Sequence, residues 1–269
     1  MNTVKPMAVV TGASSGIGRE LARRFADEGF DLLVCAEDEG LAAVAEELRG
    51  RGAAVREVRV DLATYDGVEK LYAAVSATRR PVAAAALNAG IGQGGAFLDT
   101  DLADEARVID LNIASTVHLA KRLLPGMVEL AEGRMLITSS VAAAVPGSHQ
   151  AVYNASKAFL QSFAQGLRDE LKDSGVTVTS LLPGPTDTNF FHRADMADTR
   201  LGRMRKDDPA QVAGEAFEAM MRGREKVVAG SVRTKVQGVA NKVLPDRLKA
   251  AAHRRLAEPH PDGADRPAH

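Results

Sequence analysis

The chain carries a tyrosine and a lysine at a spacing that suits proton transfer. Tyr153 and Lys157 are four residues apart, and both follow Ser140 closely. On a helix, residues i and i+4 share one face, so the phenol and the ammonium can point into one cleft. An adjacent ammonium favours the phenolate and lowers the pKa of a tyrosine. The three residues therefore form a candidate acid–base site in which Ser140 could hold a carbonyl oxygen, although chance could supply the Tyr–Lys spacing alone.

These side chains need a scaffold, and the hydrophobic pattern predicts an α/β fold. Short apolar runs predict buried strands at Met7–Val10, Asp31–Ala36, Ala54–Val60, Ala83–Leu87, Arg134–Thr138, Thr177–Leu182 and Lys226–Gly230. Longer amphipathic segments predict helices at Ile17–Glu28, Leu41–Arg49, Tyr65–Ser76, Asp104–Ala131, Ala151–Lys172 and Ala210–Met220. The alternation predicts a single-domain, Rossmann-like, doubly wound parallel sheet with helices on both faces.

The domain is expected to span residues 1–257. Within it, 186–208 breaks the alternation and has no clear period, which is typical of a substrate lid. Residues 231–257 form a basic C-terminal extension, and 258–269, with three prolines and little apolar bulk, are expected to be disordered.

Composition limits the classes of partner. The chain has 269 residues, 45% of them hydrophobic, and a formal net charge of −1. Near-neutrality argues against nucleic acid or an anionic membrane as a global partner. The single cysteine, Cys35, excludes an internal disulfide, suits a reducing compartment and fits a buried strand position. With no apolar run long enough for a signal peptide or a membrane span, a soluble cytoplasmic protein is expected. No His/Cys/Asp cluster has metal-ligand spacing, so no metal is expected.

The basic charge is concentrated near the C-terminus. Between Arg222 and Leu256 there are ten Lys or Arg residues against two acids. The segment could lie on an anionic membrane surface. Alternatively, it could be a solvated helix face, or it could pack on a partner subunit. We favour solvation or subunit packing, because Pro245 interrupts the helical spacing of the apolar residues. The apolar residues concerned are Val236, Val239, Val243, Leu244 and Leu248.

The first strand runs into a glycine-rich turn that suits phosphate binding. The turn is Thr11-Gly12-Ala13-Ser14-Ser15-Gly16-Ile17-Gly18, and a helix follows directly. Glycines there allow positive φ and close approach of the backbone, and the helix N-terminus offers free N–H groups to a pyrophosphate. A glycine turn that opens a series of alternating strands and helices indicates a dinucleotide site.

Polar residues follow the next strands at the same edge. Glu37 follows the second strand, where dinucleotide folds place an acid on the adenosine ribose. A carboxylate repels a 2′-phosphate, and no Arg or Lys is expected nearby, so NAD is favoured over NADP; a solvated loop acid is the alternative. Asp61-Leu62 follows the third strand and Asn88-Ala89-Gly90 the fourth. Their common position favours one shared ligand.

With these motifs in order, the chain resembles the core-only branch of the short-chain dehydrogenase/reductase family. The resemblance covers roughly Lys5 to Gly230 and implies that Tyr153 exchanges a proton with a carbonyl or alcohol oxygen. It implies that Lys157 lowers the pKa of Tyr153 and holds the nicotinamide ribose, and that Ser140 binds the substrate oxygen. Asn112 would hold a water in a proton relay. The loop after the sixth strand would cover the nicotinamide through Pro183, Gly184, Thr186 and Thr188.

The sequence thus predicts a hydride-transfer oxidoreductase acting on a secondary alcohol or ketone. The alternative is a catalytically silent NAD(P)-binding sensor or scaffold. A partly apolar small-molecule substrate is expected, with these residues near the pocket mouth: Phe97, His149, Phe190, Phe191, His192 and Met196. A homodimer or homotetramer is expected, but the strand at Val227–Gly230 lacks the Gly-rich ending of many tetrameric members of the family.

Overall fold

A sheet of seven parallel strands forms the centre of the molecule. The structure, a computed structural model, describes residues 4–236 and 245–258. The strands are β1 (Met7–Thr11), β2 (Asp31–Ala36), β3 (Val55–Arg59), β4 (Val82–Leu87), β5 (Gly133–Thr138), β6 (Val176–Pro183) and β7 (Lys226–Ala229), in the order β3-β2-β1-β4-β5-β6-β7. The strand order reverses between β1 and β4, and ligands of such sheets bind beyond the carboxyl ends of the strands at that point.

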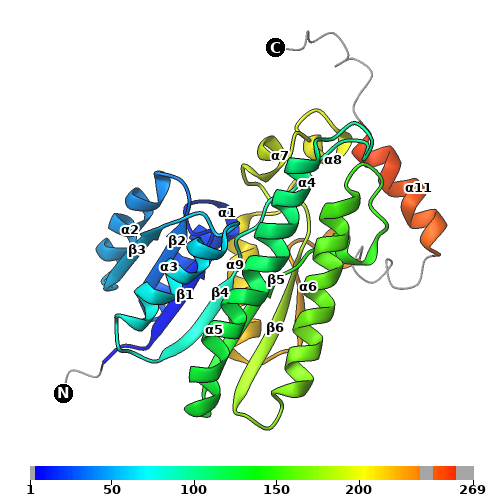
Figure 1. Cartoon of the computed structure of the whole chain (residues 1–269). Helices are drawn as coiled ribbons and strands as arrows, with labels where there is room; N and C mark the ends of the chain where they lie inside the picture. Colours follow the sequence, from blue (N-terminus) through cyan, green and yellow to red (C-terminus); the bar gives the residue numbers. More distant parts are fainter. Residues whose placement is uncertain (1–3, 237–244, 259–269) are drawn as a thin grey trace.

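Helices cover both faces of the sheet (Figure 1). One face carries α1 (Gly16–Asp27), α2 (Gly40–Gly50) and α9 (Pro209–Met221). The other carries α3 (Tyr65–Ser76), α5 (Ser115–Glu129) and α6 (Ala151–Glu170). Each face has its own apolar core, which Ala, Val and Leu dominate. The doubly wound, single-domain Rossmann-like sheet expected from the sequence is therefore confirmed.

Local sequence signals explain several helix starts. The Thr64 hydroxyl accepts a hydrogen bond from Gly67 N at the start of α3, and the Asp208 carboxylate accepts one from Ala210 N at the start of α9. Both are N-caps, and Pro209 in the first turn of α9 is preset for a helix. On the sheet side, Phe25 packs edge-on against Phe217, with ring centroids 5.0 Å apart, which joins α1 to α9.

The expected helix Asp104–Ala131 is interrupted in the structure. It divides into α4 (Leu102–Ile109), a π-helical turn η1 (Asp110–Ala114) and α5. The Ser115 N–H bonds to the Asp110 carbonyl, five residues back instead of four. Single π turns of this kind are frequent at functional sites, and this one contains Asn112.

Two further expectations differ in detail. β3 was expected to be buried, but it is an edge strand whose Arg56, Glu57 and Arg59 side chains are exposed. That expectation was wrong because an edge strand has a neighbour on one side only. The predicted lid, 186–208, contains two short helices, α7 (Phe190–Arg193) and α8 (Arg200–Arg203).

The C-terminal extension folds back onto the same chain. Helix α11 (Asp246–Ala257) contacts α8 and lies beside it in Figure 1. Of the tail expected to be disordered, only Glu258 belongs to the described residues; 259–269 lie outside them, as do Val239, Val243 and Leu244. Among the helices described, none is long and apolar enough to cross a membrane.

Candidate active site

A continuous cleft runs along the carboxyl ends of the strands, at the β1/β4 switch point. Every cofactor-binding residue expected from the sequence lines it except Gly18, and Ser140 lines it too. The expected residues that line it are Gly12, Ser14, Ser15, Gly16, Ile17, Glu37, Asp61, Leu62, Asn88, Ala89, Gly90, Tyr153, Lys157, Pro183, Gly184, Thr186 and Thr188. Asn112 lies behind the cleft wall.

The glycine turn has the geometry of an anion cradle. Gly12 and Gly16 have φ angles of +65° and +54°, which non-glycine residues rarely adopt. Ser15 caps α1 with an extended backbone and no side-chain bond, so no side chain of the cap occupies the first-turn N–H groups. Gly18 acts differently: a Cβ there would lie 2.1 Å from the Gly12 carbonyl oxygen. Its role is to let α1 pack closely beneath the turn.

The edge of the cleft beside β2 and β3 gathers acids around one arginine. The Arg107 guanidinium donates to Glu37 Oε2 at 2.7 Å and to Asp61 Oδ2 at 3.0 Å. The hydrogen bond from Arg107 lowers the pKa of Asp61 against the opposing effect of burial. Ser14 Oγ donates to Asp38 Oδ2 at 2.6 Å. Arg107 therefore fixes both the Glu37 and the Asp61 carboxylates at the edge of the cleft beside β2 and β3.

The expectation that no basic residue lies near Glu37 is wrong. Arg107 lies far from Glu37 in the sequence, on α4, and Arg59 Nε donates to the Glu37 carbonyl at 3.1 Å. No motif in the sequence pairs these residues. The pairing results from the tertiary fold, which brings the last turn of α4 beside the residues that follow β2 and β3.

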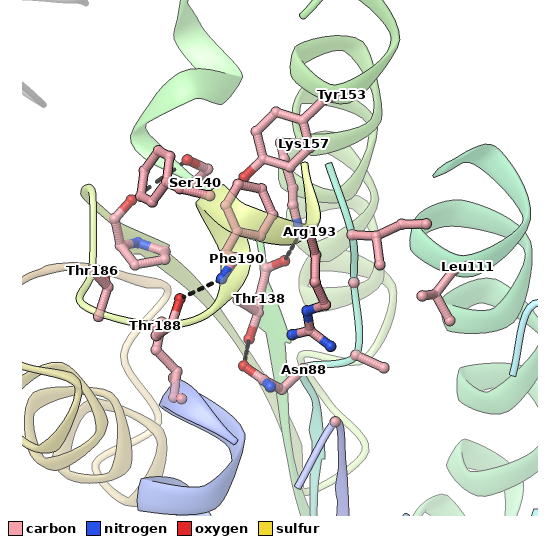
Figure 2. A pocket seen from close by; sticks show the side chains of 18 of the residues that line it. Asn88, Leu111, Thr138, Ser140, Tyr153, Lys157, Thr186, Thr188, Phe190 and Arg193 are labelled. Carbon is pink, nitrogen blue, oxygen red and sulfur yellow. Dashed lines mark hydrogen bonds between the residues drawn. The ribbon is translucent and has the colours of Figure 1, made fainter. Parts of the chain in front are cut away.

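Asn88 is held from two sides. Its backbone N–H and that of Ala89 donate to Thr11 Oγ1, at 2.9 and 3.0 Å. Its side-chain oxygen accepts from Thr138 Oγ1 at 3.2 Å (Figure 2). These bonds tie β1, β4 and β5 together at the switch point and fix the floor of the cleft.

Tyr153 and Lys157 lie on one face of α6 and are almost completely buried. Lys157 Nζ donates to the Thr138 carbonyl at 3.0 Å and lies 5.8 Å from the centre of the Tyr153 ring. Burial lowers the pKa of Lys157 to about 8. Burial also raises the pKa of Tyr153 to about 12, which a hydrogen bond with Ser140 opposes. The expected lowering of the Tyr153 pKa by Lys157 is therefore wrong for this structure: the pKa is raised, because desolvation exceeds the effect of the Ser140 hydrogen bond.

Ser140 and its neighbour Ser139 have different surroundings. Ser139 Oγ donates to the Lys157 carbonyl at 2.7 Å, so it is committed to anchoring α6. Ser140 Oγ accepts from Ala142 N at 3.1 Å and makes a long 3.5 Å contact with the Pro183 carbonyl. The Ser140 hydroxyl faces the cleft beside Tyr153, as Figure 2 shows. It is therefore the serine positioned to receive a substrate oxygen.

Asn112 is fully buried and its amide is well satisfied. Its side-chain oxygen accepts from Ile91 N, and its Nδ2 donates to the Ile91 carbonyl and to Ser156 Oγ, each at 2.9 Å. A Cβ on Gly90 would lie 3.0 Å from Asn112 Oδ1 and 3.3 Å from Lys157 Nζ. The amide therefore fixes the backbone segment after β4, and Gly90 of that segment leaves little space between the Asn112 amide and Lys157 Nζ.

The segment after β6 closes the cleft from above. Thr188 Oγ1 accepts from Phe190 N at 3.2 Å, and a Cβ on Gly16 would lie 2.7 Å from Thr188 Cγ2. The Phe190 ring lies 5.3 Å from the Tyr153 ring. From α7, Arg193 points toward Asn88 (Figure 2). Sequence reasoning missed Arg193, because a lone arginine in an irregular segment carries no spacing signal.

Only part of the expected pocket mouth lines the cleft. Phe190 and Phe191 do, together with Leu201 and, from α11, His253 and Leu256. Four of the expected residues do not line the cleft: Phe97 and His192 are exposed, Met196 is buried in a small apolar cluster, and His149 is absent from the lining. Within the described residues, no group of three or more His, Cys, Asp or Glu could hold a metal ion.

The residues present fit a dinucleotide. The cleft combines an uncapped helix start beside two positive-φ glycines, the acids Glu37, Asp38 and Asp61 at one end, and a buried Tyr–Lys–Ser set at the other. Fold and site together define a nucleotide-dependent oxidoreductase of the doubly wound α/β class.

Comparison with known proteins agrees with this class. A family model for short chain dehydrogenases matches residues 6–198. The chain is 39% identical over 192 residues to sulfoacetaldehyde reductase 2 of Chromohalobacter salexigens, covering 68% of this chain and 74% of that protein. A short-chain dehydrogenase/reductase from Burkholderia phymatum in complex with NAD has a TM-score of 0.78 at 28% identity, covering 84% of this chain and 89% of that one. A short-chain dehydrogenase from Sphingobium yanoikuyae in complex with NADPH has the same TM-score and identity, covering 98% and 100%.

The chain belongs to the short-chain dehydrogenase/reductase family. It is an NAD(P)-dependent oxidoreductase that acts on the CH–OH or C=O group of a small molecule.

Proposed function

We propose that the protein interconverts a secondary alcohol and a ketone with Tyr153 as the acid–base residue. The observation that carries this is the burial of Tyr153 beside Ser140 and Lys157 in the same cleft as the glycine turn. A bound nicotinamide supplies or accepts the hydride. Ser140 holds the substrate oxygen, and the Tyr153 hydroxyl gives it a proton during reduction or takes one during oxidation.

Lys157 and Asn112 support this proton transfer. Charged Lys157 stabilises the phenolate that forms when Tyr153 gives up its proton, and, as the family resemblance implies, its ammonium would hold the nicotinamide ribose. Asn112 fixes the Ile91 backbone against Lys157 and, as the family resemblance implies, lies on the relay that returns a proton from solvent. Pro183, Gly184, Thr186 and Thr188 close over the nicotinamide.

Arg193 is the cofactor-binding residue that we add to this set. Among the described residues its guanidinium has no hydrogen-bond or ion-pair partner, and it points from the lid toward Asn88 at the floor of the cleft. A cation there complements the diphosphate that the start of α1 would hold.

We further propose that NAD is preferred over NADP. At the adenosine end, three acids (Glu37, Asp38 and Asp61) face the cleft, and Arg107 is shared between two of them. Because the single Arg107 guanidinium is shared between two carboxylates, this end of the cleft keeps an excess of negative charge. That charge repels the 2′-phosphate of NADP. Arg59, the other base nearby, is paired with Glu39 at 3.3 Å on the exposed edge.

The test is a panel of ketones, aldehydes and alcohols run with NADH, NADPH and their oxidised forms. Sulfoacetaldehyde belongs in the panel because a relative is named for reducing it. Turnover of a ketone or its alcohol with a higher kcat/KM for the NAD couple supports both proposals. A higher kcat/KM for NADPH overturns the cofactor preference alone.

Tyr153→Phe tests the role of the phenol. We expect turnover to fall at least about 10²-fold, because general acid–base catalysis contributes that much or more, while NADH binding measured by fluorescence stays within about twofold. Tyr65→Phe, at a side chain 66% exposed outside the cleft, is the matched control and should keep full activity. If the wild type binds NADH but transfers hydride to no compound, the protein is instead a silent sensor or scaffold.

We also propose a cytoplasmic location, without nucleic-acid or membrane partners. Cys35 is free and buried, which raises its thiol pKa to about 12 and leaves it without redox chemistry. The near-neutral net charge gives no field for a polyanion. Cell fractionation together with vesicle sedimentation checks this: salt-sensitive binding to anionic vesicles would contradict it.

A further inference from the structure

The C-terminal helix α11 braces the loop that connects two catalytic residues. Lys249 Nζ donates to the Ala144 carbonyl at 2.8 Å, and His253 Nδ1 lies 3.0 Å from the Ser148 carbonyl. A carbonyl can only accept, so Nδ1 of His253 carries the proton. Both carbonyls belong to the loop between Ser140 and Tyr153. The α11 helix therefore holds the spacing of these catalytic groups from outside.

The same helix shares a small apolar core with the lid. Ala257 of α11 packs with Phe191, Ala194 and Met196, and Leu201 of α8 packs against this cluster. It is separate from the two cores that flank the sheet. Lid and α11 therefore form one structural unit above the cleft.

One face of α11 lines the cleft itself. His253 and Leu256, three residues apart, share this face, whereas Arg254 and Arg255 are exposed. Arg254 and Arg255 thus point to solvent, whereas Lys249 points inward to the Ala144 carbonyl, and the face with His253 and Leu256 closes the site of its own chain. The sequence allowed this basic segment to be simply solvated, and only the outer face of α11 is. The inner face of α11 packs on the lid of the same chain.

The wall that α11 completes is apolar. Leu256 lines the cleft together with Leu201, Phe190 and Phe191, and the Phe190 ring lies 5.3 Å from the Tyr153 ring. The polar residue that α11 contributes to the cleft lining is His253, whose Nδ1 donates to the Ser148 carbonyl. Burial lowers the pKa of His253, so the ring stays neutral at physiological pH.

We propose that α11 forms the outer wall of the substrate subsite, that Leu256 selects ketones and alcohols with a long apolar arm, and that His253 is a positioning residue for the loop between Ser140 and Tyr153. This rests on the proposed ketone–alcohol activity and adds the class of substrate. Removing each CH₂ of an apolar arm from water is favourable, and Leu256 supplies contact surface for that arm.

The test for Leu256 compares butan-2-one with octan-2-one. In Leu256→Ala we expect kcat/KM for octan-2-one to fall about tenfold, while kcat/KM for butan-2-one changes less than about twofold. Arg254→Ala, on the exposed face of the same helix, is the control and should leave both values unchanged. An equal effect on the two ketones, or none on either, overturns the subsite.

Binding separates this proposal from the activity on which it rests. Calorimetric titration of octan-2-one into wild type saturated with NAD⁺ should give an affinity that Leu256→Ala weakens about tenfold. If neither ketone is turned over but this difference in binding appears, the proposed activity fails and the subsite stands. Absence of octan-2-one binding to the wild type refutes the subsite.

His253 is tested by conservative rescue. His253→Leu removes the N–H that Ser148 accepts, and we expect kcat to fall about tenfold with the KM for NADH unchanged. His253→Asn keeps a donor at the position of Nδ1 and should recover most of the loss. A fall of the same size in both variants, or in neither, contradicts the positioning role.

Discussion

At the scale of single residues, the buried ammonium of Lys157 costs stability. Its pKa is lowered from 10.5 to about 8 because the folded state desolvates the charge. The unfolded chain keeps its proton up to about pH 10.5, so the penalty is fully present below pH 8 and disappears as the pH rises through 10.5. A group for which we propose a catalytic role therefore lowers the stability of the fold.

Lys157→Met should therefore make the protein more stable and inactive. We expect the free energy of unfolding at pH 7 to rise by about 1–3 kcal/mol, because the substitution removes the cost of burying a charge. Loss of the hydrogen bond to the Thr138 carbonyl offsets only part of this gain. Thermal denaturation at pH 7 and pH 10 measures this. The gain in stability should be smaller at pH 10 than at pH 7. A gain of the same size at both pH values would mean that better packing, and not removal of the charge, stabilises the variant.

The same group sets a pH limit on activity. Lys157 is charged below about pH 8, while Tyr153, with a pKa raised to about 12, stays protonated throughout. We expect kcat/KM for ketone reduction to be level up to about pH 8 and to fall above it, because a neutral Lys157 no longer stabilises the phenolate. A profile that stays level to pH 10 would remove Lys157 from this role.

Residues that a motif spaces along the chain could be predicted from sequence, whereas residues brought together only in space could not. Tyr153, Lys157 and Ser140 lie in one cleft as their spacing indicated. Arg107 was missed because it meets Glu37 only through the tertiary fold, and Arg193 because the lid has no period. His253 was missed because the sequence of the basic extension does not indicate whether its helix packs on its own chain or on a partner subunit.

At the scale of elements, the glycine turn depends on a close approach that no side chain tolerates. A Cβ on Gly18 would lie 2.1 Å from the Gly12 carbonyl and 2.6 Å from Asn88 Nδ2. Gly18→Ala should therefore force α1 away from the turn, weakening NADH binding at least about tenfold and destabilising the fold by about 1–3 kcal/mol.

Gly214→Ala is the matched control for this change. Gly214 lies inside α9, and nothing comes within 4 Å of a Cβ placed there. Alanine in a helix interior is favoured over glycine by about 0.5–1 kcal/mol, so this variant should be slightly more stable and bind NADH normally. NADH fluorescence titration and thermal denaturation compare the affinity for NADH and the stability of the two variants. If Gly18→Ala behaves like Gly214→Ala, the glycine turn can accommodate a Cβ at position 18.

The periodicity of hydrophobic residues predicted the order of strands and helices, but it did not predict the local irregularity in the helix that contains Asn112. The sequence predicted one helix over Asp104–Ala131 because its apolar positions continue past Asn112. The structure inserts a π turn there, which buries the Asn112 amide against the Ile91 backbone. Such a turn depends on tertiary contacts with Ile91 and Ser156, which a local pattern does not contain.

At the scale of the whole molecule, one face of the protein has exposed apolar side chains on adjoining helices. α5 packs over β4 and β5, and α6 over β5 and β6, so the two helices are neighbours on one face of the sheet. Val128 on α5 is 39% exposed and Phe159 on α6 is 42% exposed, the latter stacked on Phe163 at 5.9 Å. We propose that a second copy of the chain covers this face.

A dimer through α5 and α6 makes a definite prediction about two substitutions. Phe159→Glu places a charge in the covered face and should convert the dimer to a monomer in light scattering after size-exclusion chromatography, with secondary structure unchanged. Val232→Glu, 77% exposed beyond the β7 edge, is the control and should remain dimeric. If Val232→Glu alone changes the assembly, the β7 edge is the interface and the α5–α6 face is not.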